Sequence, residues 1–81
     1  MTASRVTLVG KPGCHLCDDA RQAVVQVLTE FEGVELDERS ILDDAALRDL
    51  YAEEIPVVLI DGVQHTYWHV DPERLRRALA G

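Results

Sequence analysis

The stretch Val9–Arg21, VGKPGCHLCDDAR, joins a strand-like segment to a helix-like segment and contains both cysteines of the chain. Cys14 and Cys17 are separated by two residues, so on a helix they lie on one face about one turn apart. A disulfide that closes so short a loop gains little loop-closure entropy, and a structural cross-link therefore explains the pair poorly. The spacing indicates either a redox-active dithiol or half of a metal site.

The residues on either side of this stretch predict a strand followed by a helix. Arg5–Val9 alternates between polar and apolar residues, which is typical of a strand, and the following GKPG segment ends it. Beyond the cysteines, apolar residues recur at helical spacing: Leu16, Ala20, Ala23, Val24, Val27 and Phe31. We expect this helix to end near Gly33, which is suited to cap it.

The middle of the chain predicts a second strand and a short second helix. Val34–Arg39 alternates again and is interpreted as a strand. Ser40 and Asp43 resemble a capping box that starts a helix. Three apolar residues of that helix are expected to face the core: Leu47, Leu50 and Tyr51.

The C-terminal half predicts a hairpin. Val57–Ile60 is the most apolar four-residue run of the chain and suits a strand buried on both faces. Asp61 and Gly62 form a dipeptide favoured in two-residue turns, so Val63–Trp68 is expected to pair antiparallel with this strand.

A final helix completes the predicted fold. Asp71 is suited to the N-cap and Pro72 to the first helical position, with Leu75 and Leu79 pointing inward. The order β-α-β-α-β-β-α predicts an α/β fold in which one mixed four-stranded sheet has three helices distributed over both faces. With 81 residues, we expect a single domain over residues 1–81.

Composition excludes several classes of function. The formal net charge of −7 disfavours nucleic acid and anionic membranes as partners. The N-terminal stretch has too short an apolar run for a signal peptide, and no later run is long enough to span a membrane. We therefore expect a cytoplasmic protein, and a monomer, in a compartment where thiols are kept reduced.

The position of the cysteines suggests how they react. An ordinary thiol is mostly protonated near neutrality, whereas the start of a helix favours an anion. We therefore expect Cys14 to be the nucleophile and Cys17 to resolve the mixed disulfide that forms. Gly13 allows close backbone approach, while Lys11 and His15 are candidates to stabilise the thiolate or to bind substrate. No cofactor is expected, because the dithiol itself carries the electrons.

Three motifs together resemble those of the glutaredoxin-like proteins of the thioredoxin superfamily: CHLC after a strand, IPV later in the chain, and DG at the end of the strand that follows. The resemblance covers nearly the whole chain and implies a thioredoxin-like fold and a thiol–disulfide oxidoreductase. It also implies a cis peptide bond between Ile55 and Pro56, facing the cysteines and binding a thiol substrate. Lys11 matches a lysine that the family uses to bind glutathione.

The chain departs from the family pattern at the glutathione site. Thr66 and Tyr67 stand roughly where a Gly-Gly pair is usual, and Leu16 replaces a common aromatic residue. Asp71 matches the family aspartate but is equally well explained as a helix cap. Bulky side chains in place of glycines argue against specificity for glutathione, while glutathione or another low-molecular-weight thiol stays a candidate co-substrate. The expected partners are a disulfide-containing protein or another low-molecular-weight thiol, together with a thiol reductase system.

Alternatives remain at this point. The resemblance also allows an iron–sulfur cluster shared between two chains through one cysteine each, which the second cysteine and the missing glycines disfavour. Two others follow from the residues. Cys14, Cys17, His65 and His69 are the ligand types of a two-Cys two-His zinc site, although 47 residues separate the two halves. A non-catalytic adaptor on a thioredoxin-like scaffold is the other, because fold alone does not determine function.

Overall fold

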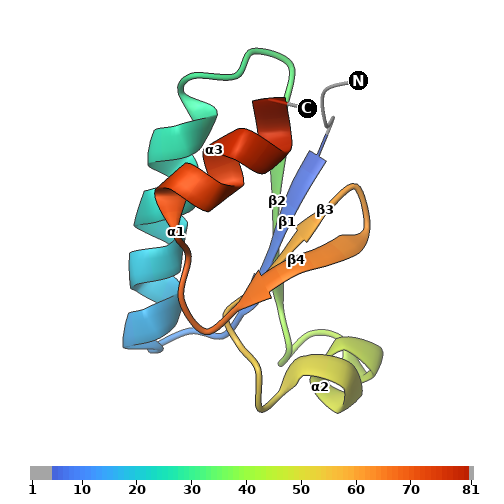
Figure 1. Ribbon diagram of the computed structural model, residues 1–81. Helices are drawn as coiled ribbons and strands as arrows, with labels where there is room; N and C mark the ends of the chain where they lie inside the picture. Colours follow the sequence, from blue (N-terminus) through green and yellow to red (C-terminus); the bar gives the residue numbers. More distant parts are fainter. Residues whose placement is uncertain (1–4, 81) are drawn as a thin grey trace.

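The computed structural model describes residues 5–80 and has the predicted order of elements (Figure 1). Residues 1–4 and residue 81 lie outside the described residues. Residues 1–4 belong to the N-terminal stretch whose apolar run is too short for a signal peptide. The seven elements, in chain order, are β1 (Arg5–Gly10), α1 (His15–Leu28), β2 (Glu35–Ser40), α2 (Ala45–Tyr51), β3 (Val57–Ile60), β4 (Val63–Tyr67) and α3 (Pro72–Ala80). Within residues 5–80, no helix combines the length and apolar character required to cross a membrane.

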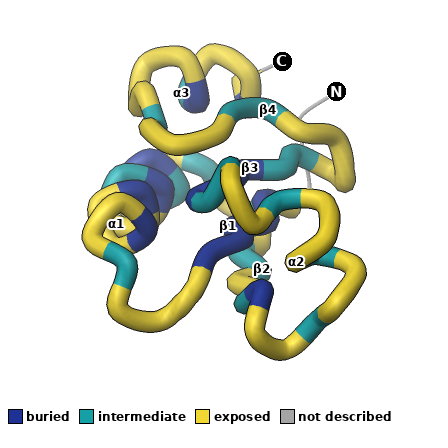
Figure 2. Tube along the Cα trace, turned by 90° about the horizontal axis from the view of Figure 1, so that it is seen from below, coloured by how far each residue is buried: buried dark blue, intermediate teal, exposed yellow. Residues whose placement is uncertain are grey.

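The four strands form one mixed sheet in the order β2-β1-β3-β4. Strands β1 and β2 are parallel, whereas β3 is antiparallel to both β1 and β4. Helices α1 and α3 lie together on one side of the sheet and α2 lies apart from them (Figures 1 and 2). The predicted thioredoxin-like α/β fold is therefore confirmed.

Two apolar clusters hold the helices against the sheet. The larger joins α1 and α3 to the sheet through the buried residues Val6, Leu8, Ala20, Val24, Val27, Val58, Leu75 and Leu79. The smaller lies under α2 and consists of Val9, Ile41 and Val57, with Leu47, Tyr51, Ile55 and Leu59 at its edge. The alternation along β1 explains this division, because neighbouring strand residues point to opposite faces. Inward-facing Leu75 and Leu79 confirm the prediction for α3.

The first helix ends earlier than predicted. It stops at Leu28, after which the backbone N–H groups of Glu30 and Phe31 donate to carbonyls three residues back. This tighter last turn carries Phe31 to the edge of the larger core cluster. Gly33, with φ of +84°, lies in the next turn and does not cap the helix.

The capping residue of α2 also differs from the prediction. Ser40 is the last residue of β2, and its hydroxyl accepts from the N–H of Leu42. Asp44 is the N-cap, because its side chain accepts from the N–H groups of Ala46 and Leu47. Leu50 was expected in the core but is 64% exposed. Helix α2 packs against the smaller cluster through Leu47 and Tyr51, and Leu50 lies outside that contact.

The hairpin and the last helix start as predicted. Asp61 and Gly62 both have positive φ, which is the conformation of the expected two-residue turn. Strand β4 ends one residue early, at Tyr67, because Trp68 leaves the strand with φ of +64°. The carboxylate of Asp71 accepts from the N–H groups of Glu73 and Arg74 and caps α3.

Candidate active site

Cys14 is the N-cap residue of α1. Its backbone is extended, with φ of −99° and ψ of 116°, while its carbonyl accepts the N–H of Asp18 and so begins the helix. Its Sγ atom accepts a hydrogen bond of 3.2 Å from the backbone N–H of Cys17. The first N–H groups of a helix have no partner within the helix and carry partial positive charge. The sulfur atom of Cys14 therefore lies where negative charge is stabilised.

Cys17 lies behind Cys14 and is only 7% exposed. The pKa of the Cys17 thiol is raised from 9.0 to about 11, first by burial and then by hydrogen bonding to Cys14. The backbone N–H of Lys11 opposes this shift in part. Both cysteines are free thiols in the structure. The pair is therefore asymmetric, with a partly exposed sulfur at the helix start and a protonated, enclosed sulfur one turn later.

Gly10 makes the position of Cys17 possible. A Cβ atom at Gly10 would lie 3.0 Å from the Sγ atom of Cys17 and 3.2 Å from its Cβ atom. Both distances are shorter than an ordinary van der Waals contact between heavy atoms. A side chain at Gly10 would therefore require Cys17 or β1 to shift by a few tenths of an ångström.

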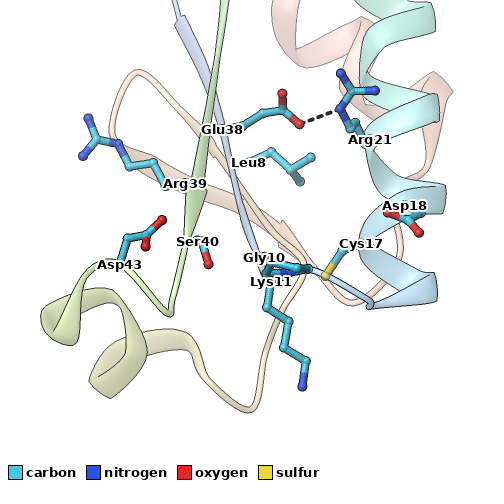
Figure 3. A pocket seen from close by; sticks show the side chains of 11 residues that line it. Leu8, Gly10, Lys11, Cys17, Asp18, Arg21, Glu38, Arg39, Ser40 and Asp43 are labelled. Atoms are coloured by element: carbon cyan, nitrogen blue, oxygen red, sulfur yellow. Dashed lines mark hydrogen bonds and ion pairs between the residues drawn. The ribbon is translucent and has the colours of Figure 1, made fainter.

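A cleft of about 340 Å³ opens on the far side of Cys17, between α1 and the C-terminal end of β2 (Figure 3). Leu8, Gly10 and Cys17 lie along its inner side, and Arg21 closes one end by donating to Glu38 over 2.6 Å. Its remaining wall is polar and is formed by Lys11, Pro12, Asp18, Arg39, Ser40 and Asp43. The buried thiol thus borders a polar cavity and not only core side chains.

The Ile55–Pro56 peptide bond is cis, and Pro56 is buried at the start of β3. The carbonyl of Pro56 accepts the N–H of Trp68 over 2.8 Å, so the segment after β4 is held against this loop. The indole N–H of Trp68 donates to the carbonyl of Glu53 over 3.0 Å. These contacts fix the side chain of Trp68, which is 50% exposed.

The other predicted site residues surround the helix start. Lys11, Gly13 and His15 are exposed, and Gly13 has φ of +75°, which favours glycine. The ammonium of Lys11 extends away from the Cys17 sulfur (Figure 3), and its contact with Cys17 is through the backbone. Leu16 is 40% exposed and lines a small cleft with Trp68.

The zinc alternative finds no support in the arrangement of its ligands. Within residues 5–80, no group of three or more His, Cys, Asp or Glu side chains is placed to hold a metal ion. The two histidines do not share a regular strand, because the register shifts at His65 and His69 follows the end of β4. Burial lowers the pKa of His65, with a smaller contribution from Arg74.

Two contributors to this site were not predicted. Gly10 carries a signal in the sequence, since a glycine between a strand and a cysteine pair can mark close backbone approach. Trp68 carries none, because a bulky residue is not expected at positive φ.

A four-stranded sheet with α1 and α3 on one side, α2 on the other, and two cysteines at the start of α1 defines a thioredoxin-like protein with a dithiol site. The chain belongs to the family described as Glutaredoxin-like domain (DUF836), which it matches over residues 5–80.

Relatives at the sequence level come from mycobacteria. "Uncharacterized protein Rv0508" of Mycobacterium tuberculosis and "Uncharacterized protein Mb0520" of Mycobacterium bovis are each 30% identical to this chain over 84 residues. Each alignment covers 99% of this chain and 87% of the relative.

Solved structures resemble the whole chain. Protein XcR50 of X. campestris, determined by X-ray crystallography, has a TM-score of 0.72 and 33% identity, covering 93% of this chain and 95% of its own. The solution structure of protein Ne2328 from Nitrosomonas europaea has a TM-score of 0.76, and the match covers 98% of this chain and 94% of that chain. Because its identity is 23%, it supports the fold alone.

Proposed function

We propose that the protein is a thiol–disulfide oxidoreductase that reduces disulfides through Cys14 and Cys17. One observation carries this proposal: the Sγ atom of Cys14 caps α1 and accepts the N–H of Cys17, which places the second thiol directly behind the first. The thiolate is the reactive form of cysteine, and helix N-termini are among the places that favour it.

The reaction proceeds in two exchanges. The thiolate of Cys14 attacks one sulfur of the substrate disulfide, the substrate S–S bond breaks, and the first substrate thiolate leaves and takes a proton from solvent. The thiol of Cys17 then loses its proton to solvent and attacks the Sγ atom of Cys14. The mixed disulfide breaks, the second substrate thiolate leaves, and a Cys14–Cys17 disulfide remains. The substrate disulfide gains two electrons and the protein loses two.

The raised pKa of Cys17 fits the resolving role. A thiol with a pKa of about 11 stays protonated at neutral pH and does not compete with Cys14 for the incoming disulfide. Once Cys14 is in a mixed disulfide, its sulfur is no longer a thiolate that accepts a hydrogen bond from the Cys17 thiol and carries charge, so two of the contributions that raise this pKa disappear. Cys17 therefore loses its proton more readily once Cys14 is in a mixed disulfide.

The remaining site residues are assigned to substrate binding. Ile55 and Pro56 form the wall of the groove against which a disulfide lies, while Gly13 and Leu16 border the helix start. Lys11 and His15 are exposed donors for a polar group of the substrate. The protein needs no resident cofactor. A dithiol reductant, or two molecules of a low-molecular-weight thiol such as glutathione, restores the reduced state, and we place this cycle in the cytoplasm.

Turnover of a small mixed disulfide tests the proposal. Reduction is followed with two regenerating systems, glutathione with its reductase and a thioredoxin reductase, for wild type and for Cys14→Ser and Cys17→Ser. Wild type should turn over with one system, and Cys14→Ser should fall to the uncatalysed background. An adaptor would instead give background rates for the wild-type protein with both systems and with a simple dithiol.

A further inference from the structure

A small cleft lies beside the dithiol, between α1 and the segment that links β4 to α3. It has a volume of about 90 Å³ and is lined by Leu16, Asp19, Ala20, Trp68, His69 and Val70. A water molecule takes up about 30 Å³ in the liquid, so the cleft holds a group about three waters in size. That is room for one side-chain head group and not for a tripeptide.

The side chains of this cleft are suited to a cation. Within residues 5–80, the carboxylate of Asp19 has no hydrogen bond or ion pair, and neighbouring Asp18 is also exposed. The indole of Trp68 is half-exposed, and an exposed indole face attracts an ammonium or guanidinium group. Leu16 and Val70 add apolar surface for the methylene groups of a long cationic side chain.

The Trp68 side chain is held by hydrogen bonds to a neighbouring loop and is not part of either core cluster. Its backbone has φ of +64°, which is unfavourable for a bulky residue, and three hydrogen bonds to the Glu53–Pro56 loop maintain it. Its ring also makes an edge contact with Tyr67, at 5.0 Å between centroids. A strained, ordered and half-exposed aromatic ring next to the proposed disulfide groove indicates recognition of a ligand.

We propose that this cleft binds the lysine or arginine side chain of a polypeptide disulfide substrate, one or two residues from the cysteine that Cys14 attacks. The proposal rests on the proposed function and adds the substrate class. Asp19 follows Cys14 by five residues, which is about 7.5 Å along a helix at 1.5 Å per residue. Two residues of extended peptide span about the same distance. The net charge of −7 also favours cationic over anionic partners.

Three peptides test the preference for a cation. They carry the same cysteine in a mixed disulfide and differ two residues away, where lysine, glutamine or glutamate is present. At pH 8, where histidines are ordinarily neutral, we expect wild type to reduce the lysine peptide about five-fold faster than the glutamine peptide, and the glutamate peptide more slowly still. Equal rates for the three peptides would overturn the inference and leave the proposed function intact.

A matched pair of variants separates the local effect from the overall charge. Asp19→Asn and Asp49→Asn remove the same charge from exposed helix positions, but Asp49 lies on α2, on the other side of the sheet. Asp19→Asn should lose the lysine preference, whereas Asp49→Asn should keep it. A preference that survives Asp19→Asn, or falls equally in both variants, would contradict the assignment.

Binding without chemistry provides a second readout. Trp68 is the only tryptophan of the chain, so its fluorescence reports on this cleft. Peptides with S-methylated cysteine cannot form disulfides, and the lysine version should shift the emission at about five-fold lower concentration than the glutamate version. No shift with either peptide would reject the cleft as a binding site. A lysine-specific shift in a protein that reduces no disulfide would reject only the proposed function.

Discussion

Replacement of Gly10 by alanine tests the packing that holds the second thiol. The new Cβ atom would lie 3.0 Å from the Sγ atom of Cys17. Ordinary contact begins near 3.5 Å, so Cys17 or β1 has to move by about 0.5 Å. Overpacking of a buried site costs about 1–3 kcal/mol, which we expect as a loss in the free energy of unfolding measured in urea. The same shift should slow the attack of Cys17 on Cys14 by about tenfold.

A symmetric aromatic disulfide that releases a coloured thiolate measures both steps. The first release reports attack by Cys14 and the second reports resolution by Cys17. Gly33→Ala is the matched control, since Gly33 has φ of +84° and no described atom lies within 4 Å of the added Cβ. That strain should cost about 1–2 kcal/mol without affecting either release. Wild-type kinetics and stability in Gly10→Ala would refute the reasoning.

Three further predictions concern pH, capping and an ion pair. Because the pKa of Cys17 is raised from 9.0 to about 11, the folded state binds this proton more tightly than the unfolded state. The free energy of unfolding of wild type relative to Cys17→Ser should therefore be constant below pH 9 and fall as pH approaches 11, and a flat difference would contradict the burial of this thiol. Asp44→Ala should destabilise the protein by about 1 kcal/mol in urea unfolding through loss of the α2 cap, while Asp43→Ala should change it by less than about 0.5 kcal/mol. A larger loss of stability in Asp43→Ala than in Asp44→Ala would instead support the capping box predicted at Ser40 and Asp43. Arg76→Gln should cost at most about 1 kcal/mol by removing the bidentate pair with Glu30 that joins α3 to the turn after α1, and 1 M salt should abolish most of that difference. A salt-independent loss would show that packing, and not charge, is responsible.

Local patterns were sufficient to predict the order of elements. The alternation in β1, the apolar run Val57–Ile60 and the turn residues Asp61 and Gly62 each specify one local conformation, and the structure contains all three. The cap at Asp71 was equally clear, because an N-cap acts through its own neighbouring N–H groups.

The ends of the helices and the exposure of Leu50 could not be predicted from local patterns, because they depend on contacts between residues that are distant in the sequence. The end of α1 is set by Phe31 reaching the core, and Leu50 is exposed because α2 packs on the sheet through Leu47 and Tyr51. Capping signals at Ser40 and Asp44 compete, and the extension of β2 to Ser40 decides between them. Tertiary placement thus overrides local preference at element ends.

The same distinction applies to the site. The position of Cys14 at the start of a helix followed from the sequence between β1 and α1. The burial of Cys17 against Gly10 and the cleft beside it depend on how β1, β2 and α1 meet in space. The role of Trp68 could not be predicted for another reason. Its positive φ is maintained by hydrogen bonds to a loop that is distant in the sequence.

The most direct measurement is the trapping of a mixed disulfide, followed by mass spectrometry of the intact protein and its peptides. Reduced Cys17→Ser and reduced Cys14→Ser are each mixed with a polypeptide disulfide at pH 7. Cys17→Ser should accumulate a stable adduct at Cys14, while Cys14→Ser should form little, because its remaining thiol is buried and burial alone raises its pKa. Equal adducts on both variants, or none on either, would contradict Cys14 as the attacking thiol.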